Sequence, residues 1–69
     1  MARYDVGLCR MVSGNLKEPY AATTIDADHG ADAVRSAKKW AAVVAGTDGS
    51  WLEVRHNGKV IKIFKLGEL

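Results

Sequence analysis

The chain has 69 residues, of which 48% are hydrophobic and 26% are charged, and its formal net charge is +2. These proportions are ordinary for a globular protein and exclude a disordered or fibrous chain, and the longest uninterrupted apolar run, Trp40 to Ala45, is too short to span a membrane. Because no apolar segment of a signal peptide follows the first residues, we expect one small cytoplasmic domain over residues 1–69. The single cysteine, Cys9, excludes an internal disulfide and a cysteine-based zinc site.

The first third of the chain predicts two strands. Residues Arg3 to Val12 alternate, with Tyr4, Val6 and Leu8 in one row, which is typical of a strand with one covered face. A turn follows at Ser13-Gly14-Asn15, and Lys17-Glu18-Pro19 lengthens the connection. The second strand is expected over Tyr20 to Ala27, paired with the first as a hairpin with a loose loop.

The middle of the chain predicts one amphipathic helix over His29 to Ala45. The residues expected on its covered face are Ala33, Val34, Ala37, Trp40, Ala41, Val44 and Ala45. Asp28 is the expected N-cap, because its carboxylate can accept the free N–H groups of the first turn. Gly46 is the expected residue directly after the helix end.

The last third predicts a tight hairpin, Trp51 to His56 and Lys59 to Leu66, joined by Asn57-Gly58. A two-residue turn sets a register in which Trp51 lies opposite Phe64 and Glu53 opposite Lys62. The core face of this hairpin would then carry Leu52, Val54, Ile61 and Ile63.

These elements predict an α+β fold of order β-β-α-β-β, with one helix on one face of a four-stranded, mostly antiparallel sheet. The preferred strand order is 2-1-3-4, in which every pair of neighbours is antiparallel. The alternative places strand 2 directly beside strand 3 and needs one parallel pair with a right-handed crossover.

The expected cross-strand pair of Trp51 and Phe64 lies on the outer face of the sheet, in one row with Val60 and Leu66. Such a pair stabilises a hairpin without any further role, but a contiguous exposed apolar surface also marks interfaces. Self-association through these four residues is therefore one interpretation, and stacking of nucleic-acid bases is another.

The basic residues Arg35, Lys38, Lys39, Lys59 and Lys62 are the candidates for nucleic-acid contacts. Phosphate binding needs a contiguous stripe of positive charge. Lys62 is assigned to the open sheet face and Arg35 to the outer side of the helix, so we expect the positive charges to be divided between two surfaces. This distribution is typical of charged residues that are simply exposed to solvent.

The pattern contains no motif for catalysis, so no catalytic, cofactor-binding or metal-ligating residue is assigned and no cofactor is expected. Cys9 lies on the outward row of the first strand, far from a suitable base, and is interpreted as a packing residue. The group of Asp28, His29 and Asp32 is interpreted as a helix start and not as a metal site.

Three local patterns carry a resemblance. They are the alternating strand Arg3-Tyr4-Asp5-Val6, the acidic residues Asp26-Ala27-Asp28 before the helical run Ala31-Asp32-Ala33-Val34, and Leu52-Glu53-Val54 before the Asn57-Gly58 hairpin. Together they resemble short bacterial β-β-α-β-β proteins of unknown function, which implies the same fold and a bacterial origin.

The predicted function is a non-enzymatic protein-interaction module without a membrane role. A homodimer through the outer face of the sheet, centred on Trp51 and Phe64, is one form of this prediction. The alternative is a nucleic-acid-binding accessory protein that uses the basic residues of the helix and the last hairpin.

Overall fold

The structure, a computed structural model, describes residues 2–46 and 49–67. Its elements in chain order are β1 (Ala2–Cys9), β2 (Met11–Val12), β3 (Asn15–Leu16), β4 (Ala21–Ala27), α1 (Gly30–Val44), β5 (Trp51–His56) and β6 (Lys59–Lys65).

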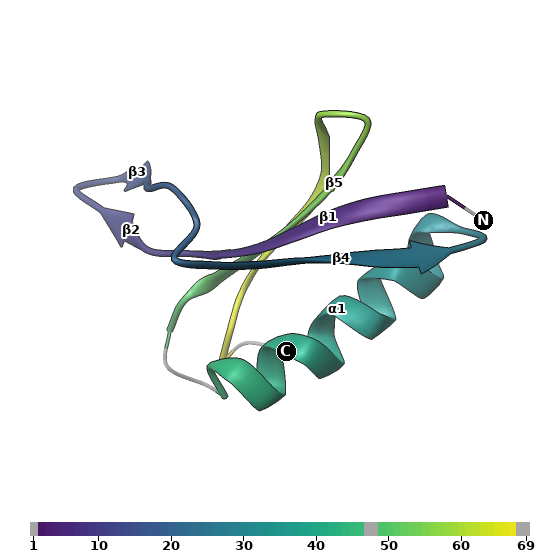
Figure 1. Cartoon of the computed structure of the whole chain (residues 1–69). Helices are drawn as coiled ribbons and strands as arrows, with labels where there is room; N and C mark the ends of the chain where they lie inside the picture. Colours follow the sequence, from purple (N-terminus) through teal and green to yellow (C-terminus); the bar gives the residue numbers. More distant parts are fainter. Residues whose placement is uncertain (1, 47–48, 68–69) are drawn as a thin grey trace.

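The fold is α+β, with one helix packed against a four-stranded antiparallel sheet, which confirms the predicted class. The sheet has the order β4-β1-β5-β6, and β2 and β3 form a separate two-stranded ribbon. This ribbon projects beyond the end of β1 and β4, while α1 lies along one side of the sheet (Figure 1). The expected β-β-α-β-β order, numbered 2-1-3-4, is not matched, because the connection after β1 forms two strands of its own.

Two tight turns are set by residues with positive φ. Asn57 and Gly58, with φ of 53° and 80°, join β5 to β6, and Ser13 and Gly14, with φ of 52° and 79°, join β2 to β3. Successive positive φ values are the geometry of the hairpin turn whose twist matches the flanking strands. Both turns lie where the sequence predicts a turn.

The helix begins one residue later than the sequence predicts and has a different cap. Its N-cap is His29, whose side chain makes no capping hydrogen bond, so the prediction that Asp28 caps the helix is wrong. Asp32 provides the negative charge in the first turn and lies 3.5 Å from Arg35. Gly46, with φ of 64°, follows the helix end as predicted and donates its N–H to the Ala41 carbonyl.

The core lies between α1 and the sheet. The helix contributes the alanines Ala33, Ala37 and Ala41, which recur every four residues and are fully buried. The sheet contributes larger side chains from the two central strands, namely Tyr4, Val6, Leu8, Leu52 and Val54. Because alanine is small, the helix backbone can approach the sheet closely while the strands fill the volume.

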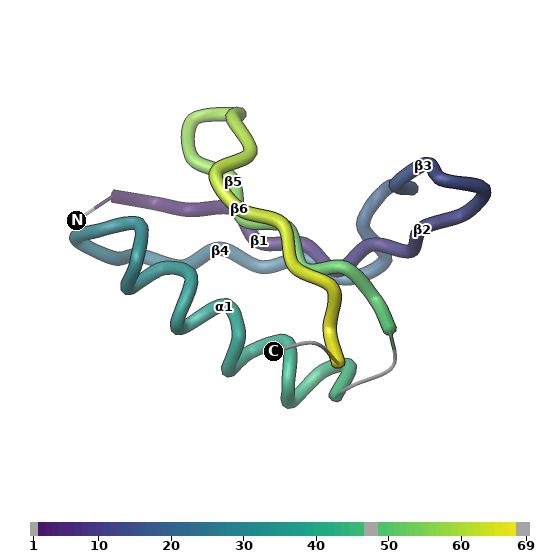
Figure 2. Tube along the Cα trace, turned by 180° about the vertical axis from the view of Figure 1, so that it is seen from behind, coloured from purple at the N-terminus to yellow at the C-terminus, as the bar shows by residue number. Residues whose placement is uncertain are grey.

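The register of the last hairpin differs from the predicted one because β6 contains a β-bulge. His56 lies opposite Lys59 and Arg55 opposite Val60, as predicted, but Val54 lies opposite Lys62, which leaves Ile61 as the extra residue. A bulge increases the local twist of the strand that contains it. The turn end of this hairpin accordingly curls away from α1, and β6 descends to the C-terminal end of the helix (Figures 1 and 2).

Candidate interaction surfaces

The bulge separates the residues predicted to form one outer patch. Trp51 lies opposite Lys65, and Phe64 lies opposite the core residue Leu52, so the predicted Trp51–Phe64 pair is wrong. Every side chain beyond the extra residue changes face, because successive residues of a strand point to opposite sides. Phe64 therefore packs on the helix side, against the core, and Leu66 is a buried core residue.

The outer face keeps a smaller apolar set than the sequence predicts. Trp51 is half-buried between Cys9 on β1 and Lys65 on β6. Val60 stays on this face opposite Arg55, and Ile63, which the sequence assigns to the core, lies opposite Glu53. The bulge that removes Phe64 from this face is thus the same feature that adds Ile63 to it.

The basic residues are redistributed by the same bulge. Lys62 lies opposite the core residue Val54 and so stands on the helix side, not on the open face to which the sequence assigns it. Its Nζ atom is 5.6 Å from the centre of the Phe64 ring, and Nζ of Lys38 on α1 is 4.6 Å from the same centre. Two ammonium groups from different elements therefore lie near one aromatic ring, and each makes a favourable cation–π interaction with it.

The other three basic candidates do not join this cluster. Arg35 forms an ion pair with Asp32 on its own helix, and Lys39 lies on the side of α1 away from the buried alanines by helical periodicity. Lys59 lies opposite His56 at the turn end of the hairpin. Of the five predicted nucleic-acid contacts, the structure thus brings together Lys38 and Lys62.

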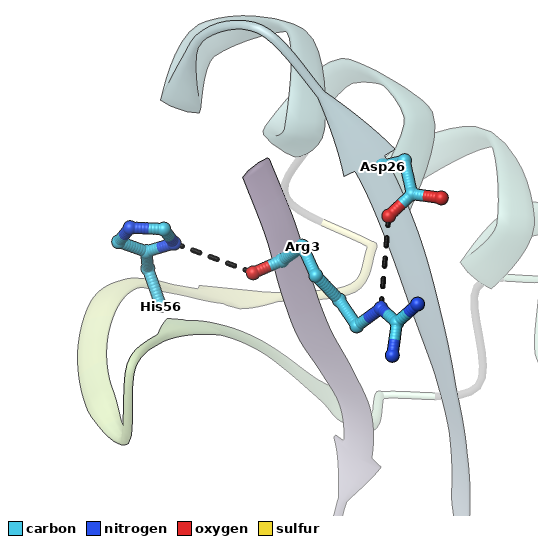
Figure 3. A network of polar contacts seen from close by, with 3 residues as sticks. All are labelled: Arg3, Asp26 and His56. Atoms are coloured by element: carbon cyan, nitrogen blue, oxygen red, sulfur yellow. Dashed lines mark hydrogen bonds and ion pairs between the residues drawn. The ribbon is translucent and has the colours of Figure 1, made fainter. Parts of the chain in front are cut away.

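His56 ties the end of β5 to the first strand. Its ring lies against the Tyr4 ring, with centres 4.7 Å apart and planes tilted by 33°. Its Nδ1 donates to the Arg3 carbonyl oxygen at 3.3 Å (Figure 3). Asn57 Nδ2 donates to the other ring nitrogen at 3.3 Å, so one neutral tautomer satisfies both contacts. Arg3 on β1 also forms an ion pair with Asp26 on β4, with 3.7 Å between Nε and Oδ1. Both side chains are exposed, so this pair contributes little to stability.

The face of the sheet away from α1 carries a hollow of about 620 Å³ that the sequence did not predict. Its lining residues are Asp5, Val6, Gly7, Glu18, Pro19, Ala22, Glu53 and Arg55. Pro19 closes one side because Gly7 has no side chain, and a Cβ built on Gly7 would lie only 3.0 Å from the Pro19 ring. A short-range sequence pattern does not indicate this contact, since it depends on how the chain returns after β3.

An ion pair lies in the wall of this hollow. The Glu53 side chain is 7% exposed and accepts a hydrogen bond from Arg55 Nε at 2.6 Å, whereas the sequence paired Glu53 with Lys62. This carboxylate raises the pKa of Arg55 through the hydrogen bond and its charge. Cys9 lies on the same face and is buried, and burial together with the Glu53 charge raises the pKa of its thiol, which disfavours the thiolate.

The most accessible large apolar side chains of the four-stranded sheet lie on its last strand. Val60, Ile61 and Ile63 are 44%, 43% and 41% exposed, and β6 is one of the two edge strands of the sheet, the other being β4. The Leu66 N–H donates to the Ser50 carbonyl at 2.8 Å, so Leu66 forms a hydrogen-bonded pair with the residue that directly precedes β5. Hydrogen-bonded and non-hydrogen-bonded pairs alternate along antiparallel strands, so Ile63, three residues before Leu66, belongs to a non-hydrogen-bonded pair with Glu53. The N–H and C=O of Ile63 therefore point away from β5.

Comparison with known proteins adds no further assignment: no protein-family model, curated protein or solved structure matches this chain. Over residues 2–46 and 49–67, the histidine, cysteine and acidic side chains form no group of three or more that can hold a metal ion. Over the same residues, no helix has the length and apolar character needed to cross a membrane.

Proposed function

We propose that this protein is a non-enzymatic protein-interaction module that binds an extended segment of a partner protein along β6. One observation carries the proposal. The seven residues of β6 form a sheet edge that bears three exposed branched apolar side chains, Val60, Ile61 and Ile63.

An added strand would complete the hydrogen bonding of this edge. The main-chain groups of Ile63 face outward, and the described part of the chain places no further strand beyond β6. A partner segment that pairs there gains main-chain hydrogen bonds and covers apolar side chains on alternate positions. Exposed edges with these two properties are templates for strand addition.

The arrangement of charge favours this function over nucleic-acid binding. Phosphate backbones are bound by contiguous positive stripes, and here Arg35 forms an ion pair with Asp32 while Lys38 and Lys62 lie over the Phe64 ring. The Phe64 ring, which would have to stack on a base, is partly buried and in contact with two ammonium groups. A bacterial source and a cytoplasmic location remain part of the proposal, on the resemblance and composition given above.

The proposal is tested with variants of Ile63. Proline lacks the N–H and is tolerated at a sheet edge where that N–H faces solvent, so Ile63→Pro should keep the fold and block an added strand. Ile63→Ala is the matched control, because it also removes the side chain but keeps the main-chain donor.

The probe is a capped synthetic peptide of about seven residues in which glutamine and valine alternate, titrated into ¹⁵N-labelled protein. We expect shifts in the β6 amides, retained in Ile63→Ala at reduced size and lost in Ile63→Pro. Shifts confined to the helix or to the Glu53 hollow, or equal binding by both variants, would contradict strand addition.

A further inference from the structure

The strand at the open edge carries positive charge only. β6 contains Lys59, Lys62 and Lys65, and the sequence from His56 to Gly67 has no acidic residue. Lys38 of α1 adds a fourth ammonium group on the helix side of this strand. Within the described residues, neither Lys38 nor Lys62 has a carboxylate at ion-pair distance.

The two sides of β6 differ in chemistry. Lys62 and Phe64 stand on the helix side, opposite Val54 and Leu52, while Ile63 stands on the outer side opposite Glu53. A strand added to β6 would continue this alternation, because directly paired residues point to the same side of a sheet. Its helix-side row would meet Lys62 and Lys38, and its outer row would meet Val60 and Ile63, with Lys65 at the far end of the same row.

From this juxtaposition we propose that the partner is an acidic, amphipathic extended segment, with Asp or Glu alternating with branched apolar residues. The inference rests on the proposed function and adds the partner's chemistry to it. Carboxylates in the helix-side row lie beside two ammonium groups that the described part of the protein leaves without an ion pair. Charge-assisted contacts of this kind are stronger than neutral ones.

A second copy of this chain fits the edge less well. Pairing β6 with β6 would bring together two strands that each carry three lysines and no acidic residue. Like charges on neighbouring strands are destabilising, and lysines on an edge strand are a common device against edge-to-edge association. The same lysines attract an acidic strand, so they select between the two occupants.

The experiment compares three capped peptides of about seven residues that alternate valine with glutamate, glutamine or lysine. Each is titrated into ¹⁵N-labelled protein at low salt, and the shifts of the β6 amides give the affinity. We expect the glutamate peptide to bind roughly 3- to 30-fold more tightly than the glutamine peptide, and the lysine peptide most weakly. The preference should shrink as salt rises toward molar concentration.

Two charge-reversal variants make the test specific. Lys62→Glu should move the preference from the glutamate peptide to the lysine peptide. Lys39→Glu makes the same change in net charge on the far side of α1 and should leave the preference unaltered.

Four outcomes overturn the inference. Equal binding of the glutamate and glutamine peptides at β6 overturns the acidic partner but leaves strand addition standing. Failure of every peptide to shift β6 overturns both. A concentration-dependent dimer that pairs through β6 in sedimentation and NMR identifies a second copy as the occupant, and displacement of the glutamate peptide by a single-stranded oligonucleotide at lower concentration identifies a nucleic acid.

Discussion

Replacing Phe64 by alanine should destabilise the protein more than replacing its neighbour Ile63. Phe64 is partly buried against the core and contacts the Lys38 and Lys62 ammonium groups, whereas Ile63 is 41% exposed on the outer face. The bulge at Ile61 is the cause of this difference, because it exchanges the faces of the two residues.

The magnitudes follow from burial. Truncation of a fully buried phenylalanine costs about 3–5 kcal/mol, so partial burial together with the lost cation contacts gives about 2–3 kcal/mol for Phe64→Ala. Truncation of a two-fifths exposed isoleucine gives about 1 kcal/mol for Ile63→Ala. For a domain of this size the two midpoints of thermal unfolding should then differ by roughly 5–15 °C.

The assay is urea and thermal unfolding followed by far-ultraviolet circular dichroism, with Phe64→Leu as a milder replacement that keeps an apolar side chain. We expect Phe64→Leu to fall between the wild type and Phe64→Ala. In a hairpin without the bulge, Ile63 would face the helix and Phe64 the solvent. A larger loss from Ile63→Ala than from Phe64→Ala would therefore refute the register described here.

Three further predictions concern the face opposite the helix. Gly7→Ala should cost about 1 kcal/mol in denaturant unfolding, because the new Cβ would lie 3.0 Å from both Cβ and Cγ of Pro19. In a Pro19→Gly background, which removes both of these atoms, the same change should be neutral or stabilising. Folding raises the pKa of the Cys9 thiol above its ordinary value of 9.0, so the thiol ionises at lower pH in the unfolded chain than in the folded protein. The free energy of unfolding should therefore fall as pH rises above about 9. A Cys9→Ala variant should lack this part of the decline. Arg55→Ala should lower the thermal midpoint, since it leaves the buried Glu53 carboxylate without its Nε donor, and adding Glu53→Gln should restore part of the loss; no recovery would show that the pair is not the cause.

Local patterns were sufficient to predict much of the fold. The buried alanines of α1 follow the helical period, and the two hairpin turns use residues that accept positive φ. The apolar row of β1, Tyr4, Val6 and Leu8, is buried as its alternation indicates. Each of these features depends on residues close together in the sequence.

The features that were missed depend on contacts between distant segments. Nothing in the run Lys59 to Lys65 marks Ile61 as an extra residue, because every register leaves apolar and basic residues on both faces. In the structure the Ile61 side chain reaches the start of α1, with its Cδ1 3.7 Å from the position of a Cβ on Gly30. The bulge is thus accompanied by a contact between Ile61 and the start of the helix, thirty-one positions away. The bulge determines which side chains the edge strand exposes.

The candidate site shows the same division. The sequence named Lys38, Lys62 and Phe64 but assigned them to different surfaces, whereas the bulge brings them together. Ile63 was assigned to the core, although it lies on the outer face of the edge strand. The sequence therefore identified the residues of the candidate site, but it could not show which of them lie together, because that depends on the register between β5 and β6.

The register of β6 is tested most directly by cross-strand nuclear Overhauser effects in the free protein. We predict a strong contact between the Hα atoms of Glu53 and Ile63, which form a non-hydrogen-bonded pair, and contacts from the Phe64 ring to the Lys38 side chain. Contacts from Trp51 to Phe64 and from Leu52 to Ile63 would show a hairpin without the bulge, and the basic edge proposed to bind an acidic strand would not exist in the form described.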